Sequence, residues 1–372
     1  MRRPLGIVSL LLAAASVFGQ TAPANDPAEK GAAERVSWAT LPQETLTFSR
    51  RILPEGLPQS PAITAPLRCS PNGTPFMEFP LPPTFMTRAL VSVTKTGKVT
   101  TYASGNNIPG LQDVSQIAYF PQDKYVYYLV EARENSFLPA ALDKSPKRYY
   151  SVKYSADGTL ESTTPLDITT GPLRIGVFPS GALAVIGVDP VEHIPQLVLL
   201  DSKGSNSHLV DIDGEGLYDP GRLRRFYPKA ADSDPAGSGL SLVASSTQFV
   251  SNGDNLLLVQ MGTDYPILEL GESGILLSVP LKLPPGSIIE SFIQSSERLW
   301  LARIADTTTN PAMHWLVAFD PGSGEAVRVI STPGIPPDSI ACDADGTFLA
   351  LRKEFEGKDS DGRWALVASS SQ

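Results

Sequence analysis

The sequence is poor in the residues from which metal centres and nucleophilic sites are most often built. Its 372 residues include only two cysteines and three scattered histidines, His193, His208 and His314. It contains no Gly-x-Ser-x-Gly, His-Glu-x-x-His or Cys-x-x-Cys segment and no phosphate-binding glycine loop. No motif therefore indicates an enzyme, and we expect no cofactor and no metal, although a site assembled from distant segments would leave no local motif.

Positive charge is also in short supply. Lysine and arginine number 30 against 39 aspartates and glutamates, which gives a formal net charge of −9. Nucleic-acid binding needs a basic surface, because the phosphate backbone supplies much of the affinity. We therefore exclude nucleic acid as the partner.

Long hydrophobic runs are absent after residue 19. Residues 1–19 begin with Arg2 and Arg3, continue as an apolar run and end in small residues, which is the pattern of an export signal that is too short for a membrane anchor. Without them the formal charge is −11, from 28 basic and 39 acidic residues. We expect a signal peptide over residues 1–19, a flexible leader over 20–44 and a folded domain over 45–372. The mature protein is then secreted or periplasmic, monomeric and not inserted in a membrane.

Uninterrupted windows for helices are rare, because the chain has 34 prolines and 30 glycines. Short alternating apolar runs between turn residues predict an all-β fold instead. One turn recurs at a spacing of roughly 50 residues, and each copy ends an apolar stretch and opens a strand rich in Leu, Val and Ala. The clear copies are residues 69–73, 177–181, 249–253 and 342–346, and degenerate copies lie at 119–123 and 293–297.

A second glycine turn lies between successive copies, as at residues 154–160 and 200–204, so that each repeat holds four strands. Four-stranded units arranged radially are the blades of a β-propeller. Repeats that begin near residues 63, 114, 173, 247, 288 and 338 predict six blades. The last repeat has only three strands, and we expect the strand over residues 45–51 to supply the fourth and close the ring. A seventh blade within residues 211–246, or a β-sandwich, is the alternative.

The two cysteines occupy equivalent positions in the first and last repeats, where the other repeats have apolar residues. Export would permit a disulfide between Cys69 and Cys342, and this bond would lock the ring. Equivalent positions in neighbouring blades need not face each other, however. We therefore prefer the interpretation that both are buried core residues.

The connections other than the glycine turns hold nearly all the long segments, and propeller topology places them on one face. Long loops on a rigid scaffold often carry binding sites. The longest, residues 211–246, is rich in the Arg and Tyr side chains that protein interfaces concentrate. The predicted binding residues in this loop are Tyr218, Arg222, Arg224, Arg225 and Tyr227.

Two loop segments imitate metal or acid-base sites. Asp211, Asp213, Glu215 and Gly216 follow a calcium-loop pattern, but Arg222 stands where that pattern needs an acid. We interpret this segment as metal-free. In another loop Asp189, Glu192 and His193 lie close together in sequence, and we interpret them as surface residues.

The innermost strands, aligned on their turns, predict which side chains surround the central channel. The binding candidates among them are Arg68, Gln116, Arg174 and Glu290. One carboxylate with two arginines suits a small anion better than a divalent metal, which needs several converging carboxylates or imidazoles. The alternative is a set of polar residues around a water-filled channel. The aligned positions are Pro66, Gln116, Arg174, Ser246, Glu290 and Ser339, followed two residues later by Arg68, Ala118, Gly176, Gln248, Phe292 and Ala341.

The repeated turn, most clearly Phe-Pro-Ser-Gly-Ala-Leu-Ala-Val at residues 178–185, resembles the blade motif of exported bacterial six-bladed propellers of the TolB, NHL and SMP-30/gluconolactonase kind. The resemblance covers residues 45–372 at the level of architecture. It implies either a binding or scaffold protein or a metal-dependent lactonase, and no metal ligand of the lactonases can be assigned to a position of this sequence.

Because a fold alone does not determine a function, three hypotheses follow. We predict a non-enzymatic propeller that binds a protein or cell-envelope component through its long-loop face. The rival is a channel-site hydrolase or lactonase that uses Glu290. The third is a small-anion binder that uses Arg68 and Arg174.

Overall fold

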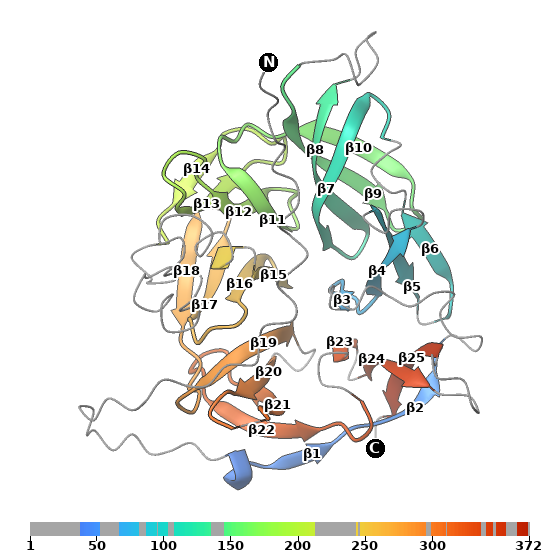
Figure 1. The fold of residues 1–372 in the computed structure, drawn as a ribbon, viewed down its shortest axis with the longest axis vertical. Helices are drawn as coiled ribbons and strands as arrows, with labels where there is room; N and C mark the ends of the chain where they lie inside the picture. The colour runs from blue at the N-terminus through green and yellow to red at the C-terminus, as the bar shows by residue number, and fades with distance from the viewer. Residues whose placement is uncertain are drawn as a thin grey trace, which may run out of the picture.

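The computed structural model describes residues 38–52, 67–81, 87–94, 96–102, 108–134, 145–212, 243–244, 246–294, 299–309, 311–335, 340–344, 347–354 and 363–370. In these ranges twenty-five strands form six sheets, which are arranged side by side around a central axis (Figure 1). The structure confirms the predicted all-β fold and the six-bladed propeller. No helix in the described ranges is long and apolar enough to span a membrane.

The first three blades are antiparallel sheets whose four strands follow one another in chain order. Blade 1 consists of β3 (Arg68–Cys69), β4 (Pro75–Leu81), β5 (Thr87–Val93) and β6 (Val99–Tyr102). Blade 2 consists of β7 (Leu111–Pro121), β8 (Tyr125–Glu134), β9 (Arg148–Ser155) and β10 (Leu160–Pro165). Blade 3 consists of β11 (Gly171–Val177), β12 (Leu183–Val188), β13 (Pro195–Leu200) and β14 (His208–Val210).

The remaining blades complete the ring, and the last one borrows its outer strand from the N-terminal part of the chain. Blade 4 consists of β15 (Thr247–Asn252), β16 (Asn255–Gln260), β17 (Ile267–Gly271) and β18 (Gly274–Val279). Blade 5 contains β19 (Ser287–Gln294), β20 (Trp300–Asp306), β21 (Met313–Phe319) and β22 (Ala326–Ser331). Blade 6 consists of β23 (Ile340–Ala344), β24 (Thr347–Glu354), β25 (Arg363–Ser370) and β2 (Thr47–Arg51).

The first strands of the six blades form a continuous inner ring. Strand β11 contacts β7 and β15, β15 contacts β19, β19 contacts β23, and β23 contacts β3. Arg68 joins β3 to β7, because its Nη1 donates to Tyr119 O at 3.5 Å. The adjacent turns are joined as well, since Asn72 N donates to Asp123 Oδ1 at 2.6 Å. Side chains of these strands are therefore brought together from blades that are distant in sequence.

The repeated turn depends on a glycine with positive φ. The φ angle is 77° at Gly73, 93° at Gly181 and 61° at Gly253, a region that other residues rarely adopt. In the clearest copy Gly181 N donates to Phe178 O at 2.9 Å. This geometry reverses the chain between the first and second strands of a blade.

The second glycine turn of a blade lies against the blade before it. Gly204, with a φ of 72°, lies so close to β10 that an added Cβ would collide with Pro165 O. Asp167 N also donates to Gly204 O at 2.8 Å, which ties the connection between blades 2 and 3 to this turn. Gly324, with a φ of 68°, contacts Pro280 O of the connection after blade 4 in the same way. The absence of a side chain at these two glycines allows the turn backbone to pack directly against the backbone of the preceding blade or the connection that follows it.

Ring closure by the N-terminal strand is confirmed, because β2 pairs antiparallel with β25. The structure adds two elements ahead of it. Strand β1 (Gln43–Thr45) pairs in parallel with β22 as a fifth strand of blade 5, and the 3-10 helix η1 (Trp38–Thr40) packs Trp38 edge-on against Phe319, with ring centroids 6.3 Å apart. The ordered chain thus begins by residue 38, within the segment expected to be a leader. The expected signal peptide lies outside the described residues.

The cysteines correct one expectation. Cys69 is disulfide-bonded, and Cys342 is the only other cysteine in the chain, so the bond joins blade 1 to blade 6. The preferred interpretation of two free core cysteines is wrong, because it treated the positions as separated around the ring. Blades 1 and 6 are in fact neighbours across the closure, where β23 contacts β3.

The hydrophobic core is divided among the interfaces between blades. One cluster joins blades 4 and 5 around Leu257, Phe292 and Trp300, and another joins blades 1 and 2 around Phe76 and Tyr128. Each sheet is therefore covered by a neighbour on both faces, as the apolar runs of its strands require. Burial of these faces positions the polar residues of the inner ring.

Candidate functional site

The predicted binding residues of the longest loop lie outside the described residues. These are Tyr218, Arg222, Arg224, Arg225 and Tyr227, and the calcium-like positions from Asp213 onward lie outside them too. The partner prediction for this loop therefore stays a prediction. The four binding candidates on the inner strands, Arg68, Gln116, Arg174 and Glu290, all lie among the described residues.

Arg68 and Arg174 come together with a buried carboxylate. Arg68 lies on β3 and Arg174 on β11, and both are partly exposed. Glu78 on β4 is 8% exposed and interacts electrostatically with Arg174, as does Arg68. The Arg68 guanidinium also lies over the Tyr119 ring, 5.3 Å from its centroid. We call Arg68, Glu78, Tyr119, Tyr128 and Arg174 the inner-ring cluster.

The electrostatics of the inner-ring cluster favour an added negative charge. Burial, and then the like charge of Arg68, lower the pKa of the Arg174 guanidinium to about 10, while the charge of Glu78 acts in the opposite direction. Arg174 is therefore still a cation at neutral pH, but a poorly solvated one. Two arginines against one glutamate leave the cluster with a formal charge of +1.

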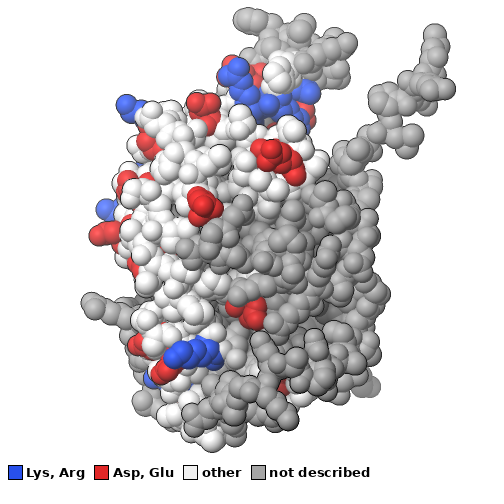
Figure 2. All heavy atoms as spheres, turned by 90° about the vertical axis from the view of Figure 1, so that its left-hand side faces the viewer, with Lys and Arg blue, Asp and Glu red and all other residues white. Residues whose placement is uncertain are grey.

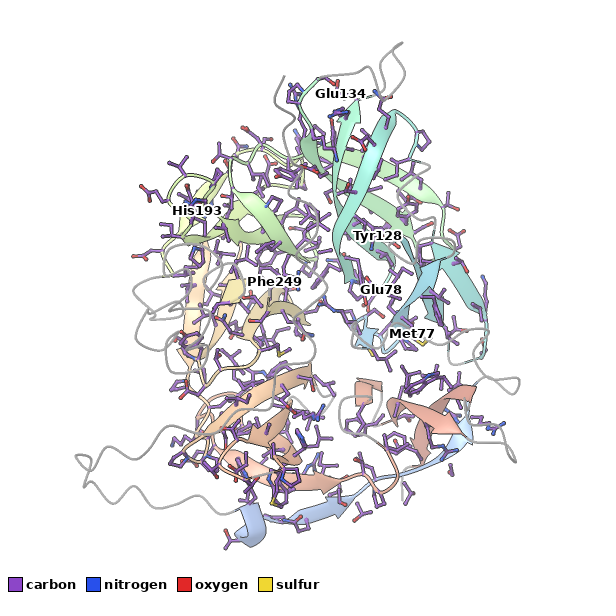
Figure 3. All side chains as sticks on the ribbon, in the orientation of Figure 1. Met77, Glu78, Tyr128, Glu134, His193 and Phe249 are labelled. Carbon is purple, nitrogen blue, oxygen red and sulfur yellow. The ribbon has the colours of Figure 1, made fainter. Side chains whose placement is uncertain are left out.

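Tyr128 adds a hydroxyl to this cluster. Its side chain is 3% exposed, and its hydroxyl has no hydrogen-bond partner among the described residues. Burial raises the pKa of Tyr128 well above its usual value, and the neighbouring Tyr154, Tyr119 and Glu78 raise it further. The hydroxyl is therefore a neutral donor. Figure 3 shows Glu78 and Tyr128 near each other where blades 1 and 2 meet.

The other inner-strand positions have separate surroundings. Gln116 lies on β7 opposite Val130, is partly exposed, and makes none of the contacts that define the inner-ring cluster. Phe292, which the alignment places at the channel, instead packs on Trp300 with ring centroids 5.9 Å apart. Gly176 lies against Phe249 of blade 4. Side chains of an inner strand alternate between its two neighbouring blades, which is why the aligned positions do not all face the axis.

Glu290 belongs to a second polar group, on blade 5. It occupies a bulge of β19 between Ile289 and Ser291, and its Oε2 forms an ion pair with Arg303 Nε at 2.7 Å. The same oxygen lies 2.9 Å from His314 Nδ1. Arg303 and His314 come from β20 and β21, so a hairpin brings all three side chains together. Sequence reasoning did not pair His314 with Glu290, because the two residues are 24 positions apart.

The loop with Asp189 and His193 is stabilised by its own hydrogen bonds. Asp189 Oδ1 accepts from the backbone N–H groups of Val191 and Glu192 at 2.7 and 2.8 Å. The bond from Glu192, followed by that from Val191, holds the pKa of Asp189 below its usual value. The carboxylate therefore acts as a loop cap, and His193 lies at the outer side of blade 3 in Figure 3.

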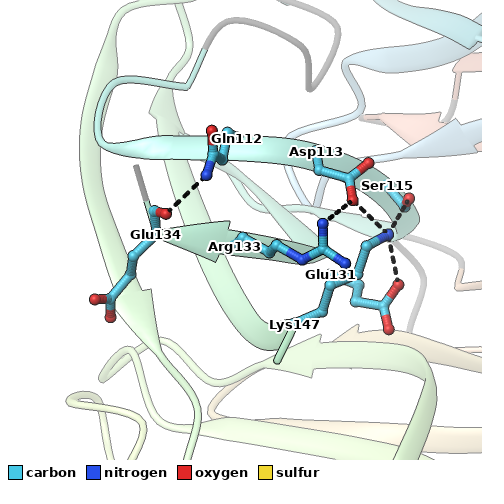
Figure 4. Close-up of polar contacts among 7 residues, drawn as sticks. All are labelled: Gln112, Asp113, Ser115, Glu131, Arg133, Glu134 and Lys147. Carbon is cyan, nitrogen blue, oxygen red and sulfur yellow. Dashed lines mark hydrogen bonds and ion pairs between the residues drawn. The ribbon is translucent and has the colours of Figure 1, made fainter. Parts of the chain in front are cut away.

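A third polar group stabilises the end of blade 2 (Figure 4). Asp113 Oδ2 lies 3.3 Å from Arg133 Nη1 and 3.6 Å from Lys147 Nζ, and Lys147 also pairs with Glu131 at 3.2 Å. Asp113 lies in a bulge of β7 with a φ of 53°. Charges of both signs balance here, so the group ties three strands together and leaves no excess charge for a ligand.

Charge elsewhere on the described surface is dispersed. On the side that Figure 2 shows, acidic and basic side chains are scattered among uncharged ones, and the basic ones at the upper end lie beside acidic ones. Among the described residues no group of three or more His, Cys, Asp and Glu side chains is placed to hold a metal ion. The inner-ring cluster is thus a place where positive charge exceeds negative charge among the described residues.

Comparison with known proteins relates this chain to others by fold. No family model and no curated protein matches the sequence. Similar solved structures include a calcium-binding protein, regucalcin, from Agrobacterium tumefaciens, at 12% identity and a TM-score of 0.42 over 88% of this chain and 97% of that chain. A streptogramin B lyase matches at 10% identity and a TM-score of 0.39, over 87% and 98%. A protein of unknown function from Dyadobacter fermentans matches at 10% identity and a TM-score of 0.40, over 88% of this chain and 96% of that chain. These values describe the fold alone, and no residue role is transferred.

Proposed function

We propose that this protein is a binding propeller whose inner-ring cluster holds a small anion, such as a carboxylate or phosphate group. The observation that carries the proposal is the pairing of two arginines from blades 1 and 3, of which Arg174 is poorly solvated, against the carboxylate of Glu78. Planar guanidinium groups donate paired hydrogen bonds to carboxylate and phosphate oxygens, so an anion would relieve the repulsion between Arg68 and Arg174. The Tyr128 hydroxyl supplies a further donor.

The cluster suits binding rather than covalent chemistry. It contains no cysteine, serine, threonine or histidine, and burial keeps the Tyr128 hydroxyl in its neutral, weakly nucleophilic form. Arginine stays protonated at neutral pH and does not exchange protons there. The arginines of the cluster therefore supply fixed positive charge to a bound anion and do not act as proton donors or acceptors at neutral pH.

A thermal-shift panel of phosphate, sulfate, acetate and citrate tests the proposal. We expect at least one anion to raise the melting temperature of the wild type in a saturable way, and Arg174→Gln to abolish this shift. Arg148→Gln is the matched control, because Arg148 is 66% exposed and lies on the rim of blade 2. A flat response of the wild type across the panel would reject the proposal.

One observation keeps the hydrolase hypothesis as a second candidate. Glu290 and His314 form a carboxylate–imidazole pair at 2.9 Å, an arrangement that general-base catalysis uses. If the protein hydrolyses an ester or lactone at this place, Glu290→Gln and His314→Gln should each lower the rate about 100-fold or more. An activity that survives both substitutions would eliminate this candidate.

The binding of a protein or envelope component by the long loop, after export, is a proposal that rests on the sequence alone. Replacement of Arg222, Arg224 and Arg225 by alanine should abolish recovery of a partner from envelope extracts. Unchanged recovery would rule the loop out. N-terminal sequencing of the mature protein should find Gln20 as its first residue if residues 1–19 are an export signal.

A further inference from the structure

A cavity separate from the inner-ring cluster lies between blades 2 and 3. Its volume is about 220 Å³, and it is lined by residues of β8, β9 and β10 and by the two turns of blade 3 at Ser180 and Ser202. Pockets for drug-sized molecules measure roughly 300–1,000 Å³, so this one fits a smaller molecule. It opens among the glycine turns and shares no lining residue with the inner-ring cluster.

The walls of the cavity are held in place by hydrogen bonds between the two blades. Gln122 Nε2, in the first turn of blade 2, donates to Val177 O at 2.7 Å and to Phe178 O at 2.9 Å on blade 3. Across the cavity, Ser180 Oγ accepts from Ala182 N at 3.1 Å and fixes the opposite turn. A preformed cavity loses little entropy when a ligand enters.

Lys153 gives the cavity a positive charge. Its Nζ lies 3.5 Å from the centroid of the Tyr125 ring and 6.0 Å from that of Tyr127. The rings attract the cation but carry no negative charge of their own, and burial raises the pKa of Tyr127 to about 12, so its hydroxyl stays neutral. The lining contains no aspartate or glutamate. The cation is therefore available to an anionic ligand.

Several hydroxyl groups of the lining are available as well. The side chains of Ser151, Ser162, Thr164 and Ser202 make no hydrogen bond within the described part of the chain. Ser151 is only 4% exposed as a residue, and it lines the cavity. A ligand with several oxygens would satisfy these groups.

We propose that this cavity binds a small hydroxylated anion, with the acidic group at Lys153 and the carbon-bound hydroxyls at the serines. The shared chemistry is an anionic group on a hydroxylated carbon skeleton, which a sugar acid and a sugar phosphate both supply. Lys153 pairs with the charge, Ser151 lies two residues away on the same strand, Ser162 lies opposite Lys153 on β10, and Ser202 reaches from blade 3. The site is independent of the inner-ring cluster.

Isothermal titration calorimetry with glucuronate, glucose 6-phosphate, glucose and inorganic phosphate tests this site. We expect saturable binding of glucuronate or glucose 6-phosphate, and which of the two binds more tightly identifies a carboxylate or a phosphate as the acidic group. Lys153→Met keeps the aliphatic stem against Tyr125 and should weaken binding about 10-fold or more, since it removes a charge-assisted hydrogen bond. Lys124→Met, at an exposed lysine in the turn before β8, is the matched control and should bind like the wild type. The wild-type cavity and its variants are compared in proteins that also carry Arg174→Gln, which removes the inner-ring cluster from the measurement.

Other outcomes overturn the proposal. Absence of binding by the wild type up to about 10 mM ligand, or equal binding by Lys153→Met, contradicts a site at Lys153. Binding of glucose as tight as that of the anions contradicts the role of charge, and inorganic phosphate as tight as glucose 6-phosphate contradicts the role of the hydroxyls. If Lys153→Met fails to fold, the double substitution Ser162→Ala and Ser202→Ala, at two exposed serines, replaces it and should also weaken binding.

Discussion

At the residue scale, the charge balance of the inner-ring cluster predicts unequal effects on stability for substitutions of its members. Glu78→Gln leaves two arginines without a counter-charge and should lower the free energy of unfolding by roughly 3 kcal/mol. Arg174→Gln leaves Arg68 and Glu78 balanced and should change it by about 1 kcal/mol or less. Urea denaturation measures both. Sulfate should restore more stability to Glu78→Gln than it adds to the wild type, and equal effects of the two substitutions would contradict the charge balance.

Sequence reasoning found two of the five residues of this cluster. Arg68 and Arg174 could be predicted, because antiparallel pairing fixes their distance from a turn. Glu78 and Tyr128 could not, because they lie on second strands, and only the packing of blades 1 to 3 brings them beside the arginines. A signal was present at Glu78, a charged residue between Phe76 and Phe79 in an otherwise apolar strand. Phe292 was misplaced because alternate side chains of an inner strand face the neighbouring blades, and Phe292 packs on Trp300 instead of facing the axis.

At the element scale, the second glycine turns act as contacts between blades. Gly204→Ala and Gly324→Ala place a Cβ against the backbone of the preceding blade at a positive φ, so each should cost roughly 3 kcal/mol of unfolding free energy. Gly253→Ala is the control, because its φ is 61° but nothing lies within 4 Å of an added Cβ. This control should cost about 1 kcal/mol. If thermal denaturation shows the same loss of stability for all three variants, the contact of these glycines with the preceding blade is contradicted.

The aspartates of these second turns predict how stability depends on pH. Hydrogen bonds hold the pKa of Asp201 and Asp320 below the usual value, from the Ser205 backbone and the Ser323 side chain respectively. Their ionised forms therefore stabilise the fold above the unfolded pKa of about 3.9, and this contribution is lost as the pH falls through the folded pKa. The double substitution of both aspartates by Asn should reduce the drop in melting temperature between about pH 5 and pH 3. Asp254→Asn is the control. A drop in melting temperature between about pH 5 and pH 3 that is the same in the double variant as in the wild type would contradict the stabilising role of the two aspartates.

The elements themselves were largely predictable, since alternating runs and positive-φ glycines mark where strands begin and reverse. Strand β1 and helix η1 were not. Gln43–Thr45 is short and pairs with a strand nearly 300 residues later, so its neighbours leave no local trace of the pairing. Trp38 is ordered by an aromatic contact with Phe319 that exists only after blade 5 has formed.

At the scale of the whole molecule, two devices close the ring: strand β2 and the disulfide of Cys69. A bond that closes so long a loop stabilises by up to about 5 kcal/mol in the chain-entropy model. We expect a lower melting temperature after reduction, and Cys69→Ser should show the same loss without reductant. The wild type in oxidising buffer is the reference. Identical melting curves in the two states would contradict a structural disulfide.

Six blades and their closure followed from the repeat, because one four-stranded unit cannot bury its faces alone and a ring of such units can. The disulfide was misjudged because of an assumption about how the blades are arranged in the whole ring. Equivalent positions in adjacent blades were treated as parallel, but the closure brings β3 and β23 into contact. The function did not follow from the architecture, because the chemistry depends on which side chains the blades bring together.

The measurement that tests the central claim most directly is a calorimetric titration of inorganic phosphate into the Lys153→Met variant, which lacks the charge of the cavity between blades 2 and 3. We predict one saturable site per chain, lost when Arg174→Gln is added and kept when Arg148→Gln is added instead. A site that persists without the Arg174 guanidinium, or no saturable site in a folded Lys153→Met protein, would contradict an anion-binding inner ring.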